Sequence, residues 1–424
     1  MLKINIKKGM ILMDKVLGII AEYNPFHNGH LYQLNKAKKE TNCKYSIAII
    51  SGNFTQRGLP SILNKWDKTR LALLGGVDLV IELPLLYSIS SAENFADGAI
   101  KILNSLNIID YLSFGVESSN FEVLNLIADV LLDEPCDFKS LLNIELSKGL
   151  SFPKARANAL NEFLHLNNCS ILDFISSPNN ILGIEYLKAL KKYNSNIYAY
   201  PVLRLKSEYN ERKINSDIAS STAIREALLN QKYSEIKNVV PENCFDFLMQ
   251  KITDDEIVLN LSAFEKQILY RLRMMSIEEI ADLPDVSEGL EFSLKNASIS
   301  CNSLSSLIES VKSKRYTYTR IQRILLYVLL NITKHDMVLS KNITPYVRII
   351  GFNEKGKFLV SKISSLNPNL KVITSVKKFI DNCDDSDLKF LLEKDICATN
   401  IYAMGYDNNK VTSQLDYTNN IVII

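Results

Sequence analysis

Short apolar runs alternate with amphipathic stretches through the first part of the chain. Between the apolar runs, apolar positions recur with a helical period. The strand-like runs cover residues 15–21, 45–50, 78–82 and 110–114, and the helical stretches cover 30–40, 64–75 and 92–105. This alternation predicts an α/β fold with a doubly wound parallel sheet, in which ligands bind at the carboxyl ends of the strands.

The pattern changes further along the chain. Helical periodicity covers residues 119–170, with breaks at Pro135 and Gly149, and a helix begins within 177–186 before a strand pattern at 196–202. After Pro241 the period is helical to about residue 335, and strands and helices are then mixed. We therefore expect a first domain over residues 1–241, a helical region over 242–341 and a small C-terminal α/β domain over 342–424.

Composition narrows the class of protein. The chain has 424 residues, of which 47% are hydrophobic, and its formal net charge is +2, so any contact with nucleic acid must come from local basic patches. The seven cysteines form no C-x-x-C pair, which favours reduced cytosolic thiols over disulfides or a zinc site. No apolar run approaches the ~20 residues that span a bilayer. We expect a cytoplasmic protein in which the residues before Met13 are dispensable.

The stretch around two histidines is the strongest candidate for chemistry. Pro25 keeps Asn24 out of the helical region, so the first strand must end in a turn. His27 and His30 then flank Gly29 where the next helix begins, so free backbone N–H groups and the helix dipole favour a phosphate there. The imidazoles can donate hydrogen bonds to a phosphorus under attack. The alternative is a pair of structural histidines in a polar turn.

A second motif lies far downstream, where hydroxyl residues open an apolar helix at Ser220-Ser221-Thr222-Ala223-Ile224-Arg225. An ordinary Ser/Thr helix cap is one interpretation. The other is a second helix N-terminus that holds the β- and γ-phosphates, with Arg225 as a charge clamp. H-x-G-H followed by S-S-T-x-I-R resembles the nucleotidyltransferase superfamily related to class I tRNA synthetases.

Polar residues at other strand ends extend the candidate site. Lys68 is expected on a solvated helix face. Glu82 is equally compatible with a loop or helix-capping acid and with a catalytic role. Gly115 either permits close approach of a ribose or an adenine ring or is a simple turn glycine. Asn179 and Asn180 either cap a helix or bind the nucleotide sugar, and Arg204 favours a phosphate contact. Candidates for phosphate or RNA contact near the second strand are Gln56, Arg57, Lys65 and Arg70.

A basic stretch over residues 311–323 holds five Lys or Arg residues and two tyrosines without an acid. Neutralisation of phosphates and stacking on tyrosine favour an RNA surface, whereas a basic helix start is the alternative. The residues predicted to bind RNA in the whole chain are Arg57, Lys65, Arg70, Arg271, Lys314, Arg315, Arg320 and Arg323.

Over nearly its whole length the chain resembles the bacterial tRNA(Met) cytidine acetate ligase family. The matching motifs include A-E-Y-N-P-F-H-N-G-H, S-G-N-F-T-Q-R-G, S-P-N-N-I-L-G-I-E-Y, S-S-T-A-I-R, K-R-Y-T-Y-T-R-I-Q-R and Y-V-R-I-I-G-F. The resemblance implies a Rossmann-like fold of the HIGH nucleotidyltransferase type. It also implies that ATP and acetate form acetyl-adenylate, from which the acetyl group passes to N4 of the wobble cytidine of elongator tRNA(Met).

The resemblance assigns roles to residues of this chain. His27, His30 and Arg225 are the implied catalytic residues, and Mg²⁺ on the phosphates is expected on chemical grounds. The implied ATP-binding residues are Ile20, Ala21, Glu22, Tyr23, Asn24, Pro25, Phe26, His27, Asn28, Gly29, His30, Gly115, Asn179 or Asn180, Arg204, Ser221, Thr222 and Arg225.

Two other functions compete with this interpretation. One is an adenylyltransferase that makes a coenzyme from a phosphorylated precursor, although such an enzyme would lack the long region past Pro241. The other is a tRNA-binding relative without catalytic activity, against which the intact His27, His30 and Arg225 argue. The partners expected on the main interpretation are acetate and elongator tRNA(Met), with no membrane; the sequence leaves the oligomeric state open.

Overall fold

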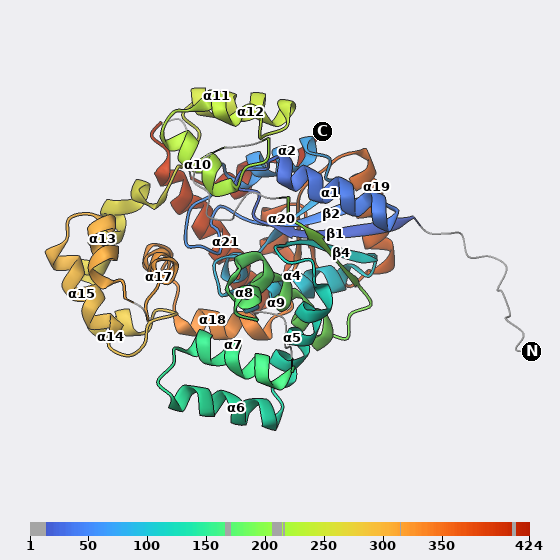
Figure 1. The fold of residues 1–424 in the computed structure, drawn as a ribbon. Helices are drawn as coiled ribbons and strands as arrows, with labels where there is room; N and C mark the ends of the chain where they lie inside the picture. The colour runs from blue at the N-terminus through green and yellow to red at the C-terminus, as the bar shows by residue number, and fades with distance from the viewer. Residues whose placement is uncertain (1–13, 166–170, 206–213, 215–216, 314, 409–412) are drawn as a thin grey trace, which may run out of the picture.

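A computed structural model describes the chain except residues 1–13, 166–170, 206–213, 215–216, 314 and 409–412. Its centre is one sheet with the strand order β5-β4-β1-β2-β3-β6-β7, to which β8 adds by pairing with β6 (Figure 1). The strands are β1 (Lys15–Ala21), β2 (Cys43–Ser51), β3 (Leu79–Leu83), β4 (Tyr111–Val116), β5 (Tyr198–Leu203), β6 (Val347–Phe352), β7 (Val372–Ile373) and β8 (Val422–Ile423).

The first five strands are parallel, which confirms the predicted doubly wound α/β fold. The chain moves from β1 to β2 and β3 on one side and then returns to β4 and β5 on the other. The strand order therefore reverses between β1 and β4, and ligands of such sheets bind outside the strand ends at this point. The main connecting helices are α1 (Asn28–Thr41), α2 (Lys65–Leu74), α4 (Ala92–Leu106) and α9 (Pro178–Lys192).

The C-terminal strands do not form a sheet of their own. β6 pairs antiparallel with β3, and β7 and β8 both pair with β6. Residues 342–424, expected as a small α/β domain, thus extend the sheet of the first domain. Their helices are α19 (Glu354–Leu366), α20 (Val376–Asn382), α21 (Ser386–Tyr402) and α22 (Leu415–Thr418).

The remaining regular elements of the described chain are helices. Predicted breaks are confirmed at Pro135, which precedes α6, and at Gly149, between α6 and α7. The helices before residue 241 are α3 (Leu85–Ser88), α5 (Phe121–Asp133), α6 (Cys136–Ser147), α7 (Phe152–Phe163), α8 (Ile171–Ser176), α10 (Ser221–Leu229) and α11 (Tyr233–Ile236). Those after it are α12 (Glu242–Thr253), α13 (Glu265–Met274), α14 (Ile277–Ala281), α15 (Leu290–Ser300), α16 (Leu304–Val311), α17 (Tyr318–Leu330) and α18 (Lys334–Asn342).

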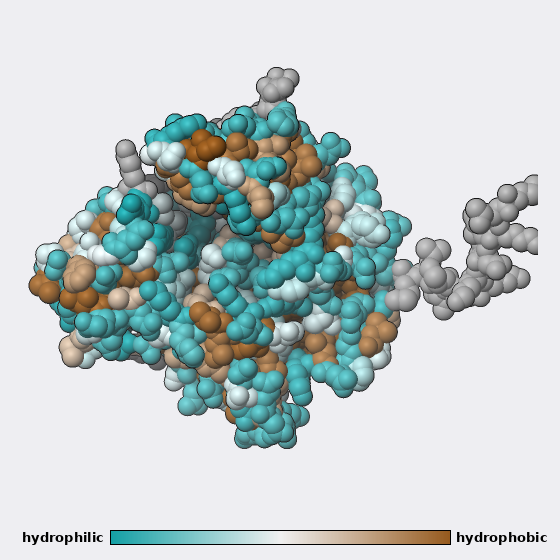
Figure 2. All heavy atoms as spheres, turned by 90° about the horizontal axis from the view of Figure 1, so that it is seen from below, coloured by the Kyte–Doolittle hydropathy of each residue, from teal (hydrophilic) through white to brown (hydrophobic). Residues whose placement is uncertain are grey.

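Helices α13–α16 form a lobe at the left of Figure 1, opposite α19. Seen from below, a hollow lies between part of this lobe and the centre of the molecule (Figure 2). None of the helices in the described residues combines the length and hydrophobicity that crossing a bilayer requires.

Apolar side chains cover both faces of the sheet. Along β1, Val16 and Ile20 belong to the core on one face, whereas Leu17 and Ile19 belong to the core on the other. Since successive side chains of a strand point to opposite faces, burial of both faces requires the continuous apolar run seen in the sequence.

Two lysines of α2 are buried, although the sequence predicted that both would be accessible. Lys68, expected on a solvated face, is 1% exposed, and its Nζ donates to Ser51 O and Ser61 Oγ at 2.7 and 2.9 Å. Lys65, expected to contact phosphate or RNA, is fully buried, so the prediction that it binds tRNA is wrong. Periodicity along α2 missed this because the strands and the C-terminal segment enclose the helix on more than one side.

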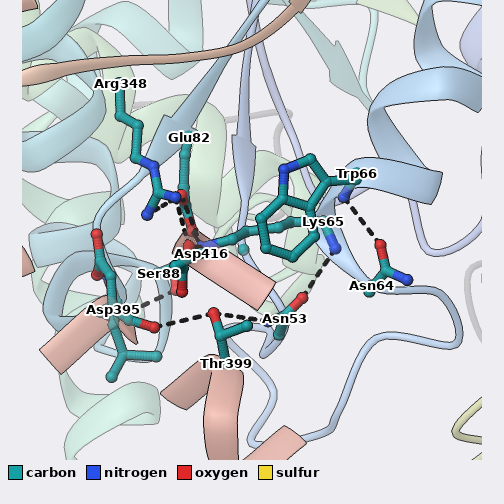
Figure 3. A network of polar contacts seen from close by, with 12 residues as sticks. Asn53, Asn64, Lys65, Trp66, Glu82, Ser88, Arg348, Asp395, Thr399 and Asp416 are labelled. Carbon is teal, nitrogen blue, oxygen red and sulfur yellow. Dashed lines mark hydrogen bonds and ion pairs between the residues drawn. The ribbon is translucent and has the colours of Figure 1, made fainter. Parts of the chain in front are cut away.

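The Lys65 ammonium belongs to a buried ion network (Figure 3). Its Nζ lies 3.0 Å from Glu82 Oε1 and 2.7 Å from Asp416 Oδ1. The Arg348 guanidinium from β6 pairs with both carboxylates. Glu82 is therefore a structural acid, and neither the capping nor the catalytic role considered for it applies. The network joins β3, α2, β6 and α22, which are distant in sequence.

Candidate active site

A cavity opens at the carboxyl ends of β1 and β4, where the strand order reverses. Both sequence motifs reach it, because the turn after β1 and the start of α10 line the same space. The predicted nucleotide residues in its lining are Ile20, Ala21, Glu22, Tyr23, Asn24, His27, His30, Gly115, Asn179, Arg204, Ser221, Thr222 and Arg225. Pro25, Phe26, Asn28, Gly29 and Asn180 are not in this lining, although Gly29 lines an adjoining smaller cavity.

Direct hydrogen bonds join the two motifs. Arg225 Nη1 donates to Asn24 O at 3.0 Å, and Arg225 Nη2 donates to Thr222 Oγ1 at 3.1 Å. The Asn28 amide donates to the backbone oxygens of Asp217 and Asn238 at 3.0 and 2.9 Å, so it holds the start of α1 against the segments that flank α10 and α11. Two segments almost 200 positions apart thus form one site.

The histidine pair is held in a defined tautomer. His27 is the N-cap of α1, and its Nδ1 accepts the Gly29 N–H at 3.0 Å. His30 Nδ1 accepts the His27 N–H at 3.3 Å. An imidazole nitrogen that accepts a hydrogen bond carries no proton, so each neutral ring carries its proton on Nε2. Both histidines therefore keep an Nε2–H donor for the cavity that they line.

Burial and neighbouring cations keep both rings neutral. Burial, the stacked His30 ring and the positive charges of Arg204 and Arg225 lower the pKa of His27 well below its usual range. Burial and Arg204 lower the pKa of His30 to about 3. The ring centroids lie 3.8 Å apart, and two adjacent imidazolium ions at that distance would repel. The pair is therefore suited to donating hydrogen bonds and not to transferring protons.

Three arginines give the cavity its positive charge. Arg57 from the loop after β2, Arg204 after β5 and Arg225 of α10 all contribute to its lining. Burial lowers the pKa of each guanidinium, that of Arg225 to about 10, yet all stay protonated at neutral pH. Buried guanidinium groups are strong partners for phosphate oxygens. The cavity is thus built for a polyanion.

The second motif serves as both a cap and a site. Ser220 is the N-cap of α10 and its Oγ accepts the Ala223 N–H at 3.1 Å, as the capping interpretation predicts. Ser221 and Thr222, the first two helical residues, line the cavity. The helix N-terminus therefore points its partial positive charge at the same space as the start of α1.

The two asparagines have different environments. Asn180 is 2% exposed, and its Oδ1 accepts the Glu117 N–H at 2.8 Å, so it supports the end of β4. Asn179 lines the cavity and donates to Glu117 Oε1 at 2.5 Å. Asn179 is consequently the better candidate for a nucleotide contact.

Sequence patterns missed several residues of the cavity. Gln33, Phe95, Phe114, Leu182 and Tyr186 are part of its lining. Four of them are apolar or aromatic residues inside helices or strands, where the sequence signal is that of ordinary core. Gln33 lies one helical turn beyond His30, so its position on the same face of α1 was the available signal.

Glycine at position 29 is required by the His27 ring. A Cβ atom at this position would lie 2.9 Å from His27 Cε1 and 3.0 Å from Nδ1. We expect Gly29→Ala to displace the ring and lower the activity of the site by about 10–100-fold, because small misplacements of groups at a reaction centre have effects of this size. Pyrophosphate exchange measures the activity, and circular dichroism should show an intact fold, since alanine favours helix. Normal exchange by the variant would contradict this packing argument.

Apart from the buried Lys65, the described residues predicted to bind RNA outside the cavity lie on several different helices and loops, and Lys314 lies outside the described residues. Arg70 is exposed and lies over the Phe247 ring. Arg271 donates to Asn331 Oδ1, and Arg315 pairs with Glu288. Arg320 donates to Asp285 O, and Arg323 pairs with the Asp285 carboxylate at 2.8 Å. The acid-free stretch thus meets acids that the fold brings from another segment.

No group of three or more His, Cys, Asp or Glu residues that could hold a metal ion occurs in the described residues. The lining of the main cavity includes one carboxylate among the described residues, that of Glu22.

Comparisons with known proteins agree with this geometry. The sequence profile described as HIGH Nucleotidyl Transferase matches residues 14–417. The tRNA(Met) cytidine acetate ligase of Acetivibrio thermocellus is 41% identical over 97% of this chain and 100% of its own length. The protein of that name from Clostridium kluyveri is 41% identical over 97% of this chain and 99% of its own.

Solved structures are similar over the same length. The crystal structure of Thermotoga maritima TmcAL in its apo form superposes with a TM-score of 0.91 at 31% identity, covering 97% of this chain and 99% of that one. The same protein bound with alpha-thio ATP gives a TM-score of 0.88 at 31% identity, with the same coverage.

Proposed function

The chain belongs to the tRNA(Met) cytidine acetate ligase family of HIGH nucleotidyltransferases, and we propose that its cavity activates acetate with ATP for transfer to a tRNA. It is an ATP-dependent ligase. The product is N4-acetylcytidine at the wobble position of elongator tRNA(Met), formed in the cytoplasm where that tRNA occurs. The observation that carries this function is the convergence of His27, His30 and Arg225 on one cavity.

In the first step an acetate oxygen attacks the α-phosphorus of ATP, acetyl-adenylate forms and pyrophosphate leaves. Negative charge builds on the equatorial oxygens of that phosphorus as the bond to the leaving group breaks. The Nε2–H groups of His27 and His30 and the N-terminus of α1 stabilise this charge. Because these donors are already oriented by their Nδ1 hydrogen bonds, little reorganisation accompanies the reaction.

Pyrophosphate is held by the second motif. Arg225 lies between Asn24 O and Thr222 Oγ1, so its guanidinium is fixed before the nucleotide binds. Ser221, Thr222 and the N-terminus of α10 supply further donors toward the β- and γ-phosphates. Binding the leaving group more tightly as its charge grows favours the forward step.

The nucleoside occupies the side of the cavity near β4 and β5. Gly115 allows a close approach to the backbone, and Asn179 and Arg204 contact the sugar and phosphate. An adjoining smaller cavity, lined in part by Gly29, Val202, Leu205 and Ile218, lies beside this end of the site.

The described lining of the cavity offers few protein ligands for the Mg²⁺ ion that is expected on the phosphates. The one described carboxylate in the cavity, Glu22, already accepts a hydrogen bond from Gln56 N at 2.8 Å. The described residues therefore do not supply a set of ligands for the ion, and a magnesium ion in the site would be bound through the oxygens of the nucleotide.

An exchange experiment tests the first step. The protein is incubated with ATP, labelled pyrophosphate and either acetate, phosphopantetheine or a nicotinamide nucleotide. We expect label to enter ATP only when acetate is present. Exchange that depends on a coenzyme precursor would support the adenylyltransferase instead. Absence of exchange with all three, together with retained tRNA binding, would support the inactive relative.

We further propose that the lobe of α13–α16 and the adjacent start of α17 contact the tRNA. Tyr270 is 63% exposed next to Arg271, and the Arg315 side chain is exposed although it pairs with Glu288. An exposed ion pair contributes little, so Arg315 can exchange Glu288 for a phosphate. The hollow beside this lobe in Figure 2 leaves space for an RNA segment.

Replacement of Arg315 by alanine should weaken tRNA binding several-fold. The slope of log affinity against log salt concentration should also decrease by about one, which corresponds to one lost phosphate contact. Binding is measured by fluorescence anisotropy over a series of salt concentrations. Lys357→Ala is the control, since this exposed lysine lies on α19 at the opposite end of the molecule. An equal loss of affinity in both variants would contradict a tRNA surface at the lobe.

A further inference from the structure

The cavity lining contains one described acid, Glu22, which the resemblance counts among the ATP-binding residues but to which the steps of adenylate formation given above assign no role. Glu22 follows β1 directly, and its side chain lines the cavity with the two histidines. A carboxylate repels the phosphates that occupy this space, so its presence weakens ATP binding unless another step needs it. The first step needs only hydrogen-bond donors and cations. We therefore ask whether Glu22 acts in the second step.

The side-chain carboxylate and the backbone oxygen of Glu22 are both held by neighbouring segments. Its Oε1 accepts the Gln56 N–H at 2.8 Å, and its backbone oxygen accepts from Lys68 Nζ at 3.2 Å. The Lys68 amino group, whose pKa burial lowers to about 7, also donates to Ser51 O at 2.7 Å and so ties the end of β1 to the end of β2. The charged groups that face Glu22 come from three other segments: Arg57, Lys68 and Arg225. A carboxylate held in this way is preorganised.

The second step needs an acceptor for a proton. The exocyclic amine of cytosine is conjugated with the ring and is a weak nucleophile, and the nitrogen becomes positively charged as it attacks. A positioned base that takes the proton during the attack accelerates such reactions by about 10²–10⁴-fold. Glu and Asp are also the side chains that accept hydrogen bonds from the cytosine N4 amine.

The other described groups in the cavity cannot serve as this base. His27 and His30 use Nδ1 to accept backbone N–H groups, and their lowered pKa values show that the protonated rings are unfavourable. Burial raises the pKa of the Tyr23 and Tyr186 hydroxyls, and arginines stay protonated. Among the described lining residues, this leaves the Glu22 carboxylate.

We propose that Glu22 is a catalytic residue of acetyl transfer, where it accepts a hydrogen bond from the cytidine N4 amine and then its proton. The N4 lone pair attacks the acetyl carbonyl carbon, and a C–N bond forms. The bond between that carbon and the adenylate oxygen breaks, and AMP leaves with the electron pair. The proton from N4 passes to Glu22, which later returns it to water. This inference depends on the proposed function.

The variant Glu22→Gln tests this role, because the amide oxygen can still accept the Gln56 N–H. Two reactions are compared in the full-length protein: acetate-dependent pyrophosphate exchange, and formation of N4-acetylcytidine on a tRNA(Met) transcript. We expect transfer to fall at least 100-fold more than exchange. Hydroxylamine, a strong nucleophile that needs no base, should still convert the accumulated acetyl-adenylate to acetohydroxamate.

Glu117→Gln is the matched control. Glu117 also faces Arg57 and Arg204, but its side chain is not in the described cavity lining. If both variants change the two reactions in the same proportion, the loss of a negative charge near the arginines explains the effect. This result overturns the proposal. Normal transfer by Glu22→Gln also overturns it. Wild-type protein without acetate-dependent exchange would instead refute the proposed function itself.

Discussion

Replacement of His27 by alanine is expected to lower acetate-dependent pyrophosphate exchange by about 10³-fold. The variant loses the Nε2–H donor to the reacting phosphorus, and single donors of this kind contribute about 10²–10³-fold to a rate. It also loses the Nδ1 acceptor that caps the Gly29 N–H, so the start of α1 is disturbed. Initial rates of exchange at saturating ATP and acetate measure the effect.

Two further variants separate the roles of His27. His27→Asn keeps an N-cap side chain that can accept the backbone N–H, so it should restore thermal stability without restoring exchange. His335→Ala removes an exposed imidazole of α18 and serves as the control for histidine loss. If His27→Ala retains the exchange rate of wild-type protein, the imidazole does not stabilise the transition state.

Replacement of Asp416 by asparagine is expected to destabilise the fold by about 3–5 kcal/mol. The Asp416 carboxylate lies against Lys65 Nζ and Arg348 Nη2, and its side chain is fully buried. Without its charge, Glu82 is the one remaining carboxylate among the described residues that pairs directly with the two buried cations, although Asp395 also lies near them, and loss of one partner of a buried ion pair has effects of this size. Urea denaturation at neutral pH, followed by tryptophan fluorescence, reports the change because Trp66 lies beside Lys65.

The pH dependence of this difference has a defined sign. Burial raises the pKa of Asp416, but the ion pairs with Lys65 and Arg348 lower this pKa by more than burial raises it. The folded-state pKa therefore lies below the usual value of about 3.9. A carboxyl group with a depressed pKa stabilises the fold above its unfolded pKa and loses this contribution as pH falls through the folded value. The contribution of the Asp416 charge to the difference in unfolding free energy between wild type and Asp416→Asn should therefore decrease as the pH falls below about 4.

Asp384→Asn is the control for loss of an aspartate charge, since Asp384 is exposed. If both aspartate variants have the same denaturation midpoint as wild type, the network does not contribute to stability. A gap that widens in acid would contradict the assigned direction of the pKa shift.

The charged residues show where sequence patterns stop being informative. Lys65 and Lys68 are three positions apart on α2, and neither has the exposure that its sequence context favoured. Lys65 is neutralised by Glu82 and Asp416, which are 17 and 351 positions away. Since a buried lysine is tolerated only where partners reach it, and these partners come from other elements, no local pattern could have identified them.

The arginines of the stretch 311–323 also have partners that come from another segment of the chain. The stretch contains no acid in sequence, but Asp285 and Glu288 lie against Arg323 and Arg315 in the fold. Arg320 also directs its donors at the Asp285 backbone. The stretch is therefore partly an internal contact of the helical lobe, which is closer to the basic helix start that the sequence left open as the alternative to an RNA surface.

The sequence by itself determined the parallel strands, the helices between them and the position of both motifs at helix starts. These features depend on hydrophobic period and on residues such as Pro25 and Ser220, whose backbone preferences and hydrogen bonds act over a few positions. Tertiary structure alone decided that Arg225 reaches Asn24, that Asn179 and not Asn180 lines the cavity, and that the C-terminal strands extend the first sheet. Each of these depends on contacts between distant segments, and such contacts form only when the chain packs.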